Sequence, residues 1–302
     1  MPLMDINGHT CHYETAGEES APAVVFLHGT FLNSAMWEKQ AEALGGDCRV
    51  ITYDMRGYGQ SSCPPRFDRY EWVEDLRMLL DYLEVGRAVI CGTTMGGPIA
   101  LQFALDNPER VRGLVLAACG PGPKDAVPPL PEDFYEIRKE LIKILETDGV
   151  EAAVEAQDYF KTLSHPAMCG SDPTMPDRVR KIVAANDAAS YANLMRAGMY
   201  FNLLDPRMST RQRINRLREL ACPVLIVVGE HDIQFREHSH FMAEAIPGAV
   251  FHVLPGEGAF LTLSAPEPFN RMLSAFCKAV IDAERGNGDK PSEAAQLELE
   301  VD

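Results

Sequence analysis

Segment 90–97 constrains the fold of this chain most strongly, because it joins an apolar run to a helical stretch through glycines. It reads Ile-Cys-Gly-Thr-Thr-Met-Gly-Gly, which places Thr94 between Gly92 and Gly96. Small residues at these two positions let a strand turn sharply into a helix and hold the apical side chain in a strained backbone conformation. The sequence therefore predicts a strand, a tight turn and a helix, with the Thr94 hydroxyl presented above a sheet.

Short apolar runs alternate with amphipathic stretches along most of the chain. This alternation is typical of a mostly parallel sheet with helices on both faces. Strands are expected at 23–27, 50–53, 88–91, 114–118, 224–228 and 250–254, with an antiparallel edge hairpin at 3–6 and 10–14. Helices are expected at 35–44, 72–83, 97–107, 238–245 and 268–283. The predicted fold class is α/β, with an eight-stranded sheet.

The alternation stops between Gly120 and Ala221, where proline and glycine clusters are followed by helical patterns and no strand. These patterns lie around 133–147, 150–162, 176–186, 188–204 and 210–219. The sequence predicts a core of residues 1–120 and 222–285, a helical lid at 121–221, and a disordered acidic tail at 286–302. An independent helical domain is disfavoured, because the sheet resumes at Pro223.

The net charge limits the kinds of partner that the protein can bind, and the cysteine pattern indicates whether disulfides are expected. Among 302 residues the formal net charge is −16, which argues against nucleic acid and anionic membranes as partners. No apolar run approaches the ~20 residues of a bilayer span and no leader pattern opens the chain, so we expect a cytoplasmic protein. The 8 cysteines form no C-x-x-C pair, which favours reduced core thiols. Neither a metal nor a cofactor is expected, and a homo-oligomer stays open.

The order and spacing of four segments resemble the α/β-hydrolase fold family over residues ~20–280. Residues 28–31 (His-Gly-Thr-Phe) are similar to the family's oxyanion loop, and residues 54–61 to its D-x-R-G-x-G-x-S turn. Segment 90–97 is similar to its nucleophile elbow, with threonine in place of serine. Residues 229–232 place Asp232 where the family keeps its catalytic acid.

This resemblance implies an oxyanion hole built from backbone N–H groups. Met95, at the helix start, would supply one of them, and Thr30 or Phe31 the other. Backbone groups do not depend on these side chains, so this half of the catalytic equipment is expected to be intact. His28 belongs to the same loop, where a structural role is the more common one.

Two positions depart from the family's pattern. Thr94 keeps the hydroxyl but adds a methyl group, so nucleophile and hydrogen-bond donor both stay open as its role. Residues 255–261 (Pro-Gly-Glu-Gly-Ala-Phe-Leu) have the spacing of the loop that carries the catalytic histidine, yet Ala259 occupies its position. Alanine cannot accept a proton. A natural loss and a deliberate His→Ala substitution are both open, and the threonine at 94 favours natural divergence.

Other groups could replace the missing base. Asp232 would gain a raised pKa in an apolar pocket and could carry a proton itself, although a role in holding its loop is the competing interpretation. Glu257 is two residues from the vacant position, and Cys119 ends the strand before the lid. Five further histidines are less favoured candidates for the base, namely His165, His231, His238, His240 and His252.

The predicted lid is rich in aromatic and methionine residues, most of which should pack against the core and a few of which should line a cleft. They are Phe134, Tyr135, Tyr159, Phe160, Met168, Tyr191, Met195, Met199, Tyr200 and Phe201. This composition favours a small apolar carbonyl, ester or enolate ligand. Three functions stay open: an enzyme with an atypical triad, including elimination, decarboxylation or cyclisation; a ligand-binding pseudoenzyme; and an ordinary ester, lactone or C–C hydrolase whose histidine has been substituted.

Overall fold

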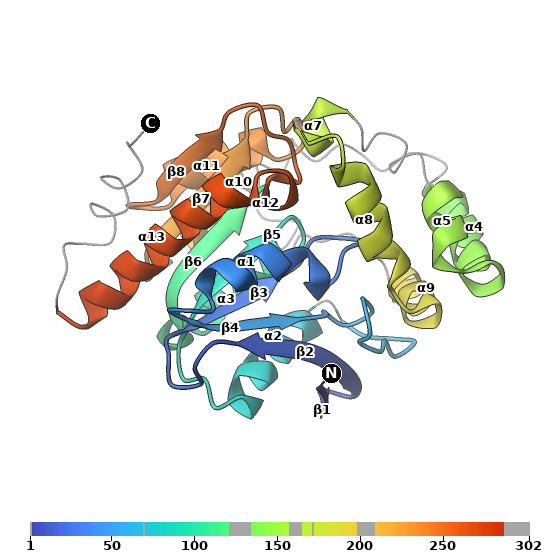
Figure 1. The fold of residues 1–302 in the computed structure, drawn as a ribbon, viewed down its shortest axis with the longest axis horizontal. Helices are drawn as coiled ribbons and strands as arrows, with labels where there is room; N and C mark the ends of the chain where they lie inside the picture. The colour runs from blue at the N-terminus through green and yellow to red at the C-terminus, as the bar shows by residue number, and fades with distance from the viewer. Residues whose placement is uncertain are drawn as a thin grey trace.

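A computed structural model describes residues 2–68, 70–120, 134–156, 165–170, 172–197 and 209–286. Eight strands form one sheet, in the order β1-β2-β4-β3-β5-β6-β7-β8 (Figure 1). They are β1 Leu3–Ile6, β2 His9–Ala16, β3 Ala23–Leu27, β4 Arg49–Tyr53, β5 Ala88–Thr93, β6 Val111–Ala117, β7 Val224–Gly229 and β8 Val250–Leu254. The predicted eight-stranded sheet is therefore confirmed.

The sheet is parallel from β4 to β8, and antiparallel only where β1 pairs with β2 and β2 with β4. In strands β3, β4, β5 and β7 every residue is buried. Burial on both faces explains why these strands read as continuous apolar runs rather than as alternating patterns. The carboxyl ends of the parallel strands meet at one edge, where β5 delivers the turn at Thr94.

Helices cover both faces of the sheet, as the sequence predicts. α1 (Glu38–Leu44) packs with α13 (Pro266–Glu284) on one face, and α2 (Glu71–Tyr82) packs with α3 (Gly96–Asp106) on the other (Figure 1). Helix α11 (Arg236–Ala245) packs on β7 and β8. Short helices η1 (Ser34–Trp37), η2 (Pro108–Arg110) and α12 (Leu261–Ser264) complete the described core. Predicted helix bounds differ from these by only a few residues, except that η1 takes the first turn expected for α1.

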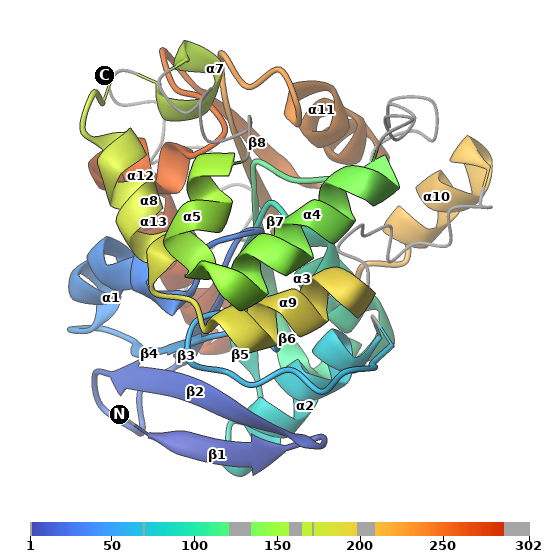
Figure 2. The same ribbon diagram turned by 90° about the vertical axis from the view of Figure 1, so that its right-hand side faces the viewer.

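Six described helices lie between β6 and β7, where the sequence predicts helices without strands. They are α4 (Phe134–Thr147), α5 (Gly149–Ala156), α7 (Pro166–Cys169), α8 (Met175–Ala184), α9 (Ala188–Ala197) and α10 (Thr210–Leu217). Helices α4, α5, α8 and α9 lie beyond the carboxyl ends of the central strands (Figure 2). The sequence pattern did not predict α7, because four residues are too short for helical periodicity.

Several expectations fall outside the described residues. They include the acidic tail from residue 287 onward and the side chains of Phe134, Tyr135, Tyr159, Phe160, Met199, Tyr200 and Phe201.

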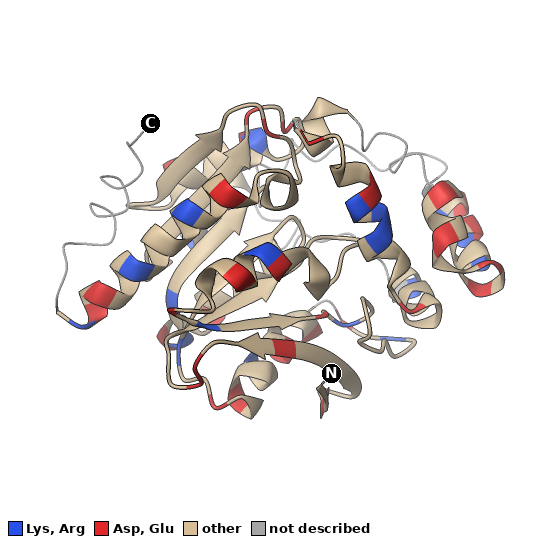
Figure 3. Ribbon diagram, in the orientation of Figure 1, with Lys and Arg blue, Asp and Glu red and all other residues tan. Residues whose placement is uncertain are grey.

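Charged residues lie mainly on the helices, whereas the central strands are nearly devoid of them (Figure 3). Along α13 the basic residues lie between acidic residues near its two ends, and residues of both signs occur together on α1 and α8 (Figure 3). Within the described residues, no helix combines the length and apolarity needed to cross a bilayer.

Candidate active site

Thr94 occupies the apex of the turn between β5 and α3 with a φ of +45°, in the left-handed region that non-glycine residues seldom adopt. A Cβ at Gly92 would collide with the backbone of Gly96, and a Cβ at Gly96 with the backbone of Leu27. The backbone N–H of Thr94 lies 3.2 Å from the carbonyl oxygens of Ala117 and Ala118, on β6 and directly after it. The two glycines and this neighbouring strand hold the strained turn in place.

The loop after β3 brings a backbone donor to the threonine. The N–H of Thr30 donates to Oγ1 of Thr94 at 3.1 Å. Gly29 must lack a side chain, because its Cβ would collide with that same oxygen. Phe31 follows with a φ of +69°. Thr30 therefore has its N–H directed at the elbow, where Met95 is the N-cap of α3.

His28 is fixed within this loop rather than presented to a ligand. Its Nδ1 lies 2.9 Å from the carbonyl oxygen of Gly29, and its Nε2 accepts the N–H of Met55 at 2.9 Å. These partners assign the proton to Nδ1. Complete burial lowers the pKa of His28 to about 4, so the ring is neutral near pH 7. His28 ties the oxyanion loop to the start of the 54–61 turn.

Asp54 organises that turn from the inside. Its carboxylate accepts the backbone N–H groups of Ser34 and Gln60, each at 2.8 Å, and lies 2.9 Å from Nδ1 of His12. Burial works against ionisation, but these hydrogen bonds leave the pKa of Asp54 lowered. The D-x-R-G-x-G-x-S segment therefore supports the loop that carries Thr30 and Phe31.

Asp232 lies in the turn after β7 and is 1% exposed. Its Oδ1 accepts the N–H groups of Gln234 at 2.9 Å and Phe235 at 2.8 Å. Its Oδ2 is buried and has no hydrogen-bond partner within the described parts of the chain. Burial raises the pKa of Asp232, although the two N–H bonds act in the opposite direction.

Ala259 lies in the loop next to Asp232 and is 4% exposed. The acid turn and this loop are joined by the N–H of His231, which donates to the carbonyl oxygen of Glu257 at 2.8 Å. On its other side the loop is bonded to α7, since the N–H of Ala259 donates to the carbonyl oxygen of Ala167 at 2.9 Å. These two hydrogen bonds hold the loop in a defined position, with alanine at 259.

Glu257 and Cys119 are both buried, and the contacts of neither side chain support a role as a substitute for the missing base. Oε2 of Glu257 accepts the hydroxyl of Ser264 at 2.5 Å, so this carboxylate does not face solvent as glutamates commonly do. The thiol of Cys119 packs against Gly97 at the start of α3. Burial first, and the nearby Asp232 carboxylate second, raise the pKa of this thiol well above its usual range.

The remaining histidines serve other positions. Nδ1 of His165 accepts the N–H of Ala167 and caps α7, while His240 lies 3.3 Å from Glu244 on α11. His231 is exposed, and His238 and His252 are half-buried. Within the described residues, the Thr94 hydroxyl is bonded to Thr30 and to no histidine.

Sequence reasoning missed Asn186, which lies between α8 and α9 and is 6% exposed. Its Nδ2 donates to the carbonyl oxygen of Phe31 at 2.9 Å, and its Oδ1 accepts the N–H of Gly59 at 2.5 Å. The Asn-Asp pair at 186–187 indicates a helix start, and Asp187 does accept the N–H of Ser190. A local signal of that kind cannot reveal a bond to a residue so far away in the sequence.

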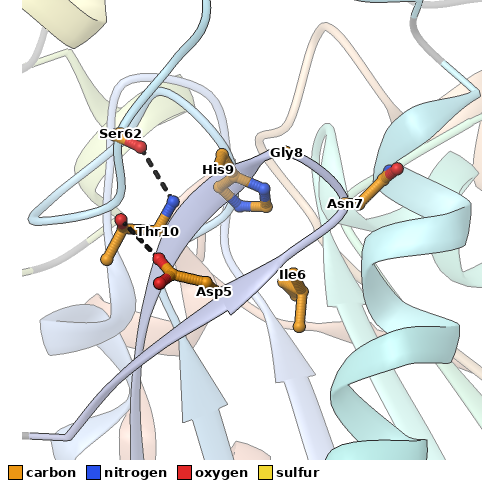
Figure 4. Close-up of a pocket in the computed structure, with 7 residues that line it drawn as sticks. All are labelled: Asp5, Ile6, Asn7, Gly8, His9, Thr10 and Ser62. Carbon is orange, nitrogen blue, oxygen red and sulfur yellow. Dashed lines mark hydrogen bonds between the residues drawn. The ribbon is translucent and has the colours of Figure 1, made fainter.

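A shallow pocket of about 370 Å³ lies at the β1–β2 hairpin, far from this site in the strand order (Figure 4). Polar groups line it, and the N–H of Thr10 donates to Oγ of Ser62 at 2.9 Å (Figure 4). No group of three or more His, Cys, Asp or Glu that could hold a metal occurs in the described residues.

Comparison with known proteins identifies the family. Residues 22–266 match the profile of the alpha/beta hydrolase fold family. The chain is 28% identical over 267 residues to a Bacillus subtilis protein provisionally named 2-succinyl-6-hydroxy-2,4-cyclohexadiene-1-carboxylate synthase, with 87% of this chain and 93% of that protein covered. It is 27% identical over 274 residues to 3-oxoadipate enol-lactonase 1 of Acinetobacter baylyi, covering 90% and 95% respectively.

A solved structure shares the fold. The enol-lactonase from Burkholderia xenovorans superposes with a TM-score of 0.71 at 24% identity, with 92% of this chain and 100% of that chain covered. All three proteins carry the names of enzymes, the first of them provisionally. Because the family profile spans most of the chain, from β3 to the start of α13, this protein belongs to the α/β-hydrolase fold family.

Proposed function

We propose that this protein is an enzyme that acts on a small apolar carbonyl, ester, lactone or enolate compound without a serine-histidine-acid triad. One observation carries the proposal: within the described residues, Oδ2 of Asp232 is buried without a hydrogen-bond partner, and the neighbouring loop has alanine at position 259, where the family pattern leads us to expect histidine. The acid and its surroundings are retained, and the base is missing. Chemistry at this site must therefore use the groups that remain.

The first contribution that the remaining groups can make to catalysis is electrostatic stabilisation of the substrate. The N–H groups of Thr30 and Met95 would bind the oxygen of a carbonyl as it gains negative charge, which is often the largest single contribution to acyl chemistry. The bond from Thr30 to the Thr94 hydroxyl supports this assignment, since it directs an N–H to the apex of the elbow. A bound substrate oxygen would take over that N–H.

The second contribution that the remaining groups can make to catalysis is proton transfer. Burial raises the pKa of Asp232, so its carboxyl is better suited than an ordinary aspartate to hold a proton and release it to a substrate. Thr94 would donate a hydrogen bond rather than attack. Elimination, decarboxylation, cyclisation and slow hydrolysis all fit an oxyanion hole paired with one carboxyl group.

The names of the relatives support this range. One is an enol-lactonase and another is named as a synthase, so hydrolytic and non-hydrolytic reactions both occur among proteins of similar sequence. An enol-lactone and an enolate share the feature that this site would recognise, an oxygen that carries negative charge during the reaction.

We also propose that the helices between β6 and β7 act as a lid that selects the ligand. Tyr191 on α9 supports this role, because its ring lies 6.4 Å from that of Phe31 and 5.9 Å from that of Tyr58. Replacing Tyr191 with leucine should therefore change the ratio of rates on short and aromatic acyl substrates. An unchanged ratio in a folded Tyr191→Leu variant would contradict the role.

Product analysis in ¹⁸O-water tests the main proposal. Turnover of enol-lactones, activated esters and β-keto acids should be slow but measurable, and lower by at least about tenfold in Asp232→Asn. A product without ¹⁸O would identify elimination or decarboxylation, and incorporation would identify hydrolysis. Turnover that is indifferent to Asp232→Asn would contradict the role given to this carboxyl.

An ordinary hydrolase whose histidine has been substituted is the second candidate. The ordered position of the 255–261 loop favours it, because the hydrogen bonds from Ala259 to α7 and from His231 to Glu257 are those of a loop still arranged to present a side chain. The variant Ala259→His distinguishes this candidate from the enzyme without a triad, because only an ordinary hydrolase should regain activity when the histidine is restored.

A further inference from the structure

The unpartnered oxygen of Asp232 needs a donor. A carboxylate oxygen that is removed from water and left without a hydrogen bond destabilises the protein unless the group is protonated or a ligand supplies the bond. Oδ1 already accepts two backbone N–H groups of its own turn, from Gln234 and Phe235. Only Oδ2 is left to receive something from outside the turn.

The neighbours of Asp232 locate this oxygen between the elbow and the 255–261 loop. The Asp232 carboxylate lies close enough to Cys119 to raise the pKa of the thiol, and Cys119 packs against Gly97 at the start of α3. On the other side, a Cβ at Gly229 would collide with the backbone of Glu257 and Gly258. Asp232 is therefore held between the helix that follows Thr94 and the loop that carries Ala259.

Among the residues that the structure describes, none donates a hydrogen bond to Oδ2 of Asp232. Ala259 has no polar side-chain atom, and the carboxylate of Glu257, on the same loop, accepts the hydroxyl of Ser264. The residues around position 259 are apolar, with Phe260 and Leu261 buried beside it. A group that enters here must combine one hydrogen-bond donor with an otherwise apolar surface.

We propose that this place is a binding site for an imidazole-type ring carried by the substrate, whose N–H donates to Oδ2 of Asp232. The proposal rests on the proposed function in that both use the same site. A neutral imidazole has a single N–H donor, which matches the single free oxygen, and a hydrogen bond to a carboxylate is among the stronger ones. An ammonium group fits less well, because two of its three N–H donors would be left unpaired. The net charge of −16 also favours the approach of a ligand that is partly protonated in solution.

Binding of free imidazole to the full-length protein tests this directly, by ligand-observed NMR titration. A ligand of five heavy atoms should bind with a Kd of about 1 mM. 1-Methylimidazole, which lacks the N–H, should bind at least about tenfold more weakly to the same protein. This comparison needs no mutation, so it does not depend on how a variant folds.

Two variants sharpen the test. In Asp232→Asn the amide oxygen can still accept the N–H groups of Gln234 and Phe235, which turns the NH₂ toward the ring's donor and should weaken imidazole binding at least about tenfold. Ala259→Val should weaken it similarly by occupying the place of the ring. Equal affinity for imidazole and 1-methylimidazole, or unchanged affinity in both variants, would overturn the proposal.

The binding assay separates this inference from the proposed function. Imidazole that binds with the predicted dependence on Asp232, in a protein that turns over no carbonyl compound, would support the site and count against the enzyme. Turnover that depends on Asp232, in a protein that does not bind imidazole, would support the enzyme and count against the imidazole site.

Discussion

The side-chain amide of Asn186 donates a hydrogen bond of 2.9 Å to the carbonyl oxygen of Phe31, across a sequence separation of 155 residues. The same side chain accepts the N–H of Gly59, and Asn33 bonds back to the carbonyl oxygen of Ile182 on α8. The loop that contains Phe31 and Asn33 and the turn that contains Gly59 are thus hydrogen-bonded to the end of α8 and the residues between α8 and α9. The loop that carries Thr30 owes its position in part to a residue that lies between β6 and β7.

Asn186→Ala should therefore reduce both stability and the order of this loop. The substitution removes the hydrogen bonds of Asn186 to the N–H of Gly59 and the carbonyl oxygen of Phe31, which should lower the free energy of unfolding by about 2–4 kcal/mol. Hydrogen exchange should accelerate at the amides of residues 30–32 and 59. Asn193→Ala is the matched control, because the half-buried Asn193 donates to the carbonyl oxygen of Cys63 and accepts only an exposed bond from Arg196, and about 1 kcal/mol is expected there. Equal losses in the two variants would contradict this account.

His28 should make the protein less stable in acid. Its pKa is lowered to about 4 by burial, whereas an unfolded histidine titrates near 6.5. Above pH 6.5 the ring is neutral in both states. As the pH falls from 6.5 toward 4, His28 becomes protonated in the unfolded chain but stays neutral in the native protein. The free energy of unfolding therefore decreases, by up to about 3 kcal/mol.

Urea denaturation between pH 4.5 and 7.5 measures this effect, with His28→Gln as the comparison. A glutamine amide can both donate and accept a hydrogen bond but does not titrate. The variant should lose less stability than the wild type over this interval. Parallel curves for the two proteins would show that His28 does not contribute.

Cys119 should be chemically inert and dispensable for activity. It is buried against Gly97, and its pKa is raised well above that of an ordinary thiol, so the reactive thiolate is scarce. Cys119→Ala should cost about 1–2 kcal/mol of stability through lost packing and leave kcat within about twofold. A larger loss of kcat at unchanged stability would reassign Cys119 to the chemistry.

Ala259→His should restore a base if the histidine is the only missing part. An imidazole placed between Asp232 and Thr94 should raise turnover of an activated ester by about 10²-fold or more. Adding Asp232→Asn to this variant should remove most of the gain, because the acid orients the ring. A folded Ala259→His protein without gain, in which the new ring stays away from Thr94, would show that more than the histidine is lacking.

The sequence predicted the sheet and the elbow because both depend on local signals. Apolar runs at β3 and β8 predicted those strands with their observed bounds, and Gly92 and Gly96 indicated the strained turn at Thr94. It predicted β6 from residue 114, whereas the strand begins at Val111, because the charge of Arg112 interrupts the apolar pattern.

Long-range contacts in the candidate site could not be predicted in this way. The sequence placed Asp232 after a strand but gave no means of knowing that one of its oxygens is unpartnered. It also left Glu257 as a candidate replacement for the missing base, whereas the fold brings the hydroxyl of Ser264 to its carboxylate. Such pairings depend on how loops from different strands meet, which periodicity does not encode.

Covalent labelling of Thr94 tests the central claim most directly, which is that the site works without a nucleophile activated by histidine. The Thr94 hydroxyl is un-ionised at neutral pH, its methyl group crowds the approach, and the loss of a triad member typically costs about 10⁴-fold in rate. We expect no stoichiometric adduct when the protein is incubated with a fluorophosphonate and its intact mass is measured, while a carbonyl-bearing apolar ligand still binds. Rapid stoichiometric labelling that maps to Thr94 would contradict the account and show that another residue activates the hydroxyl.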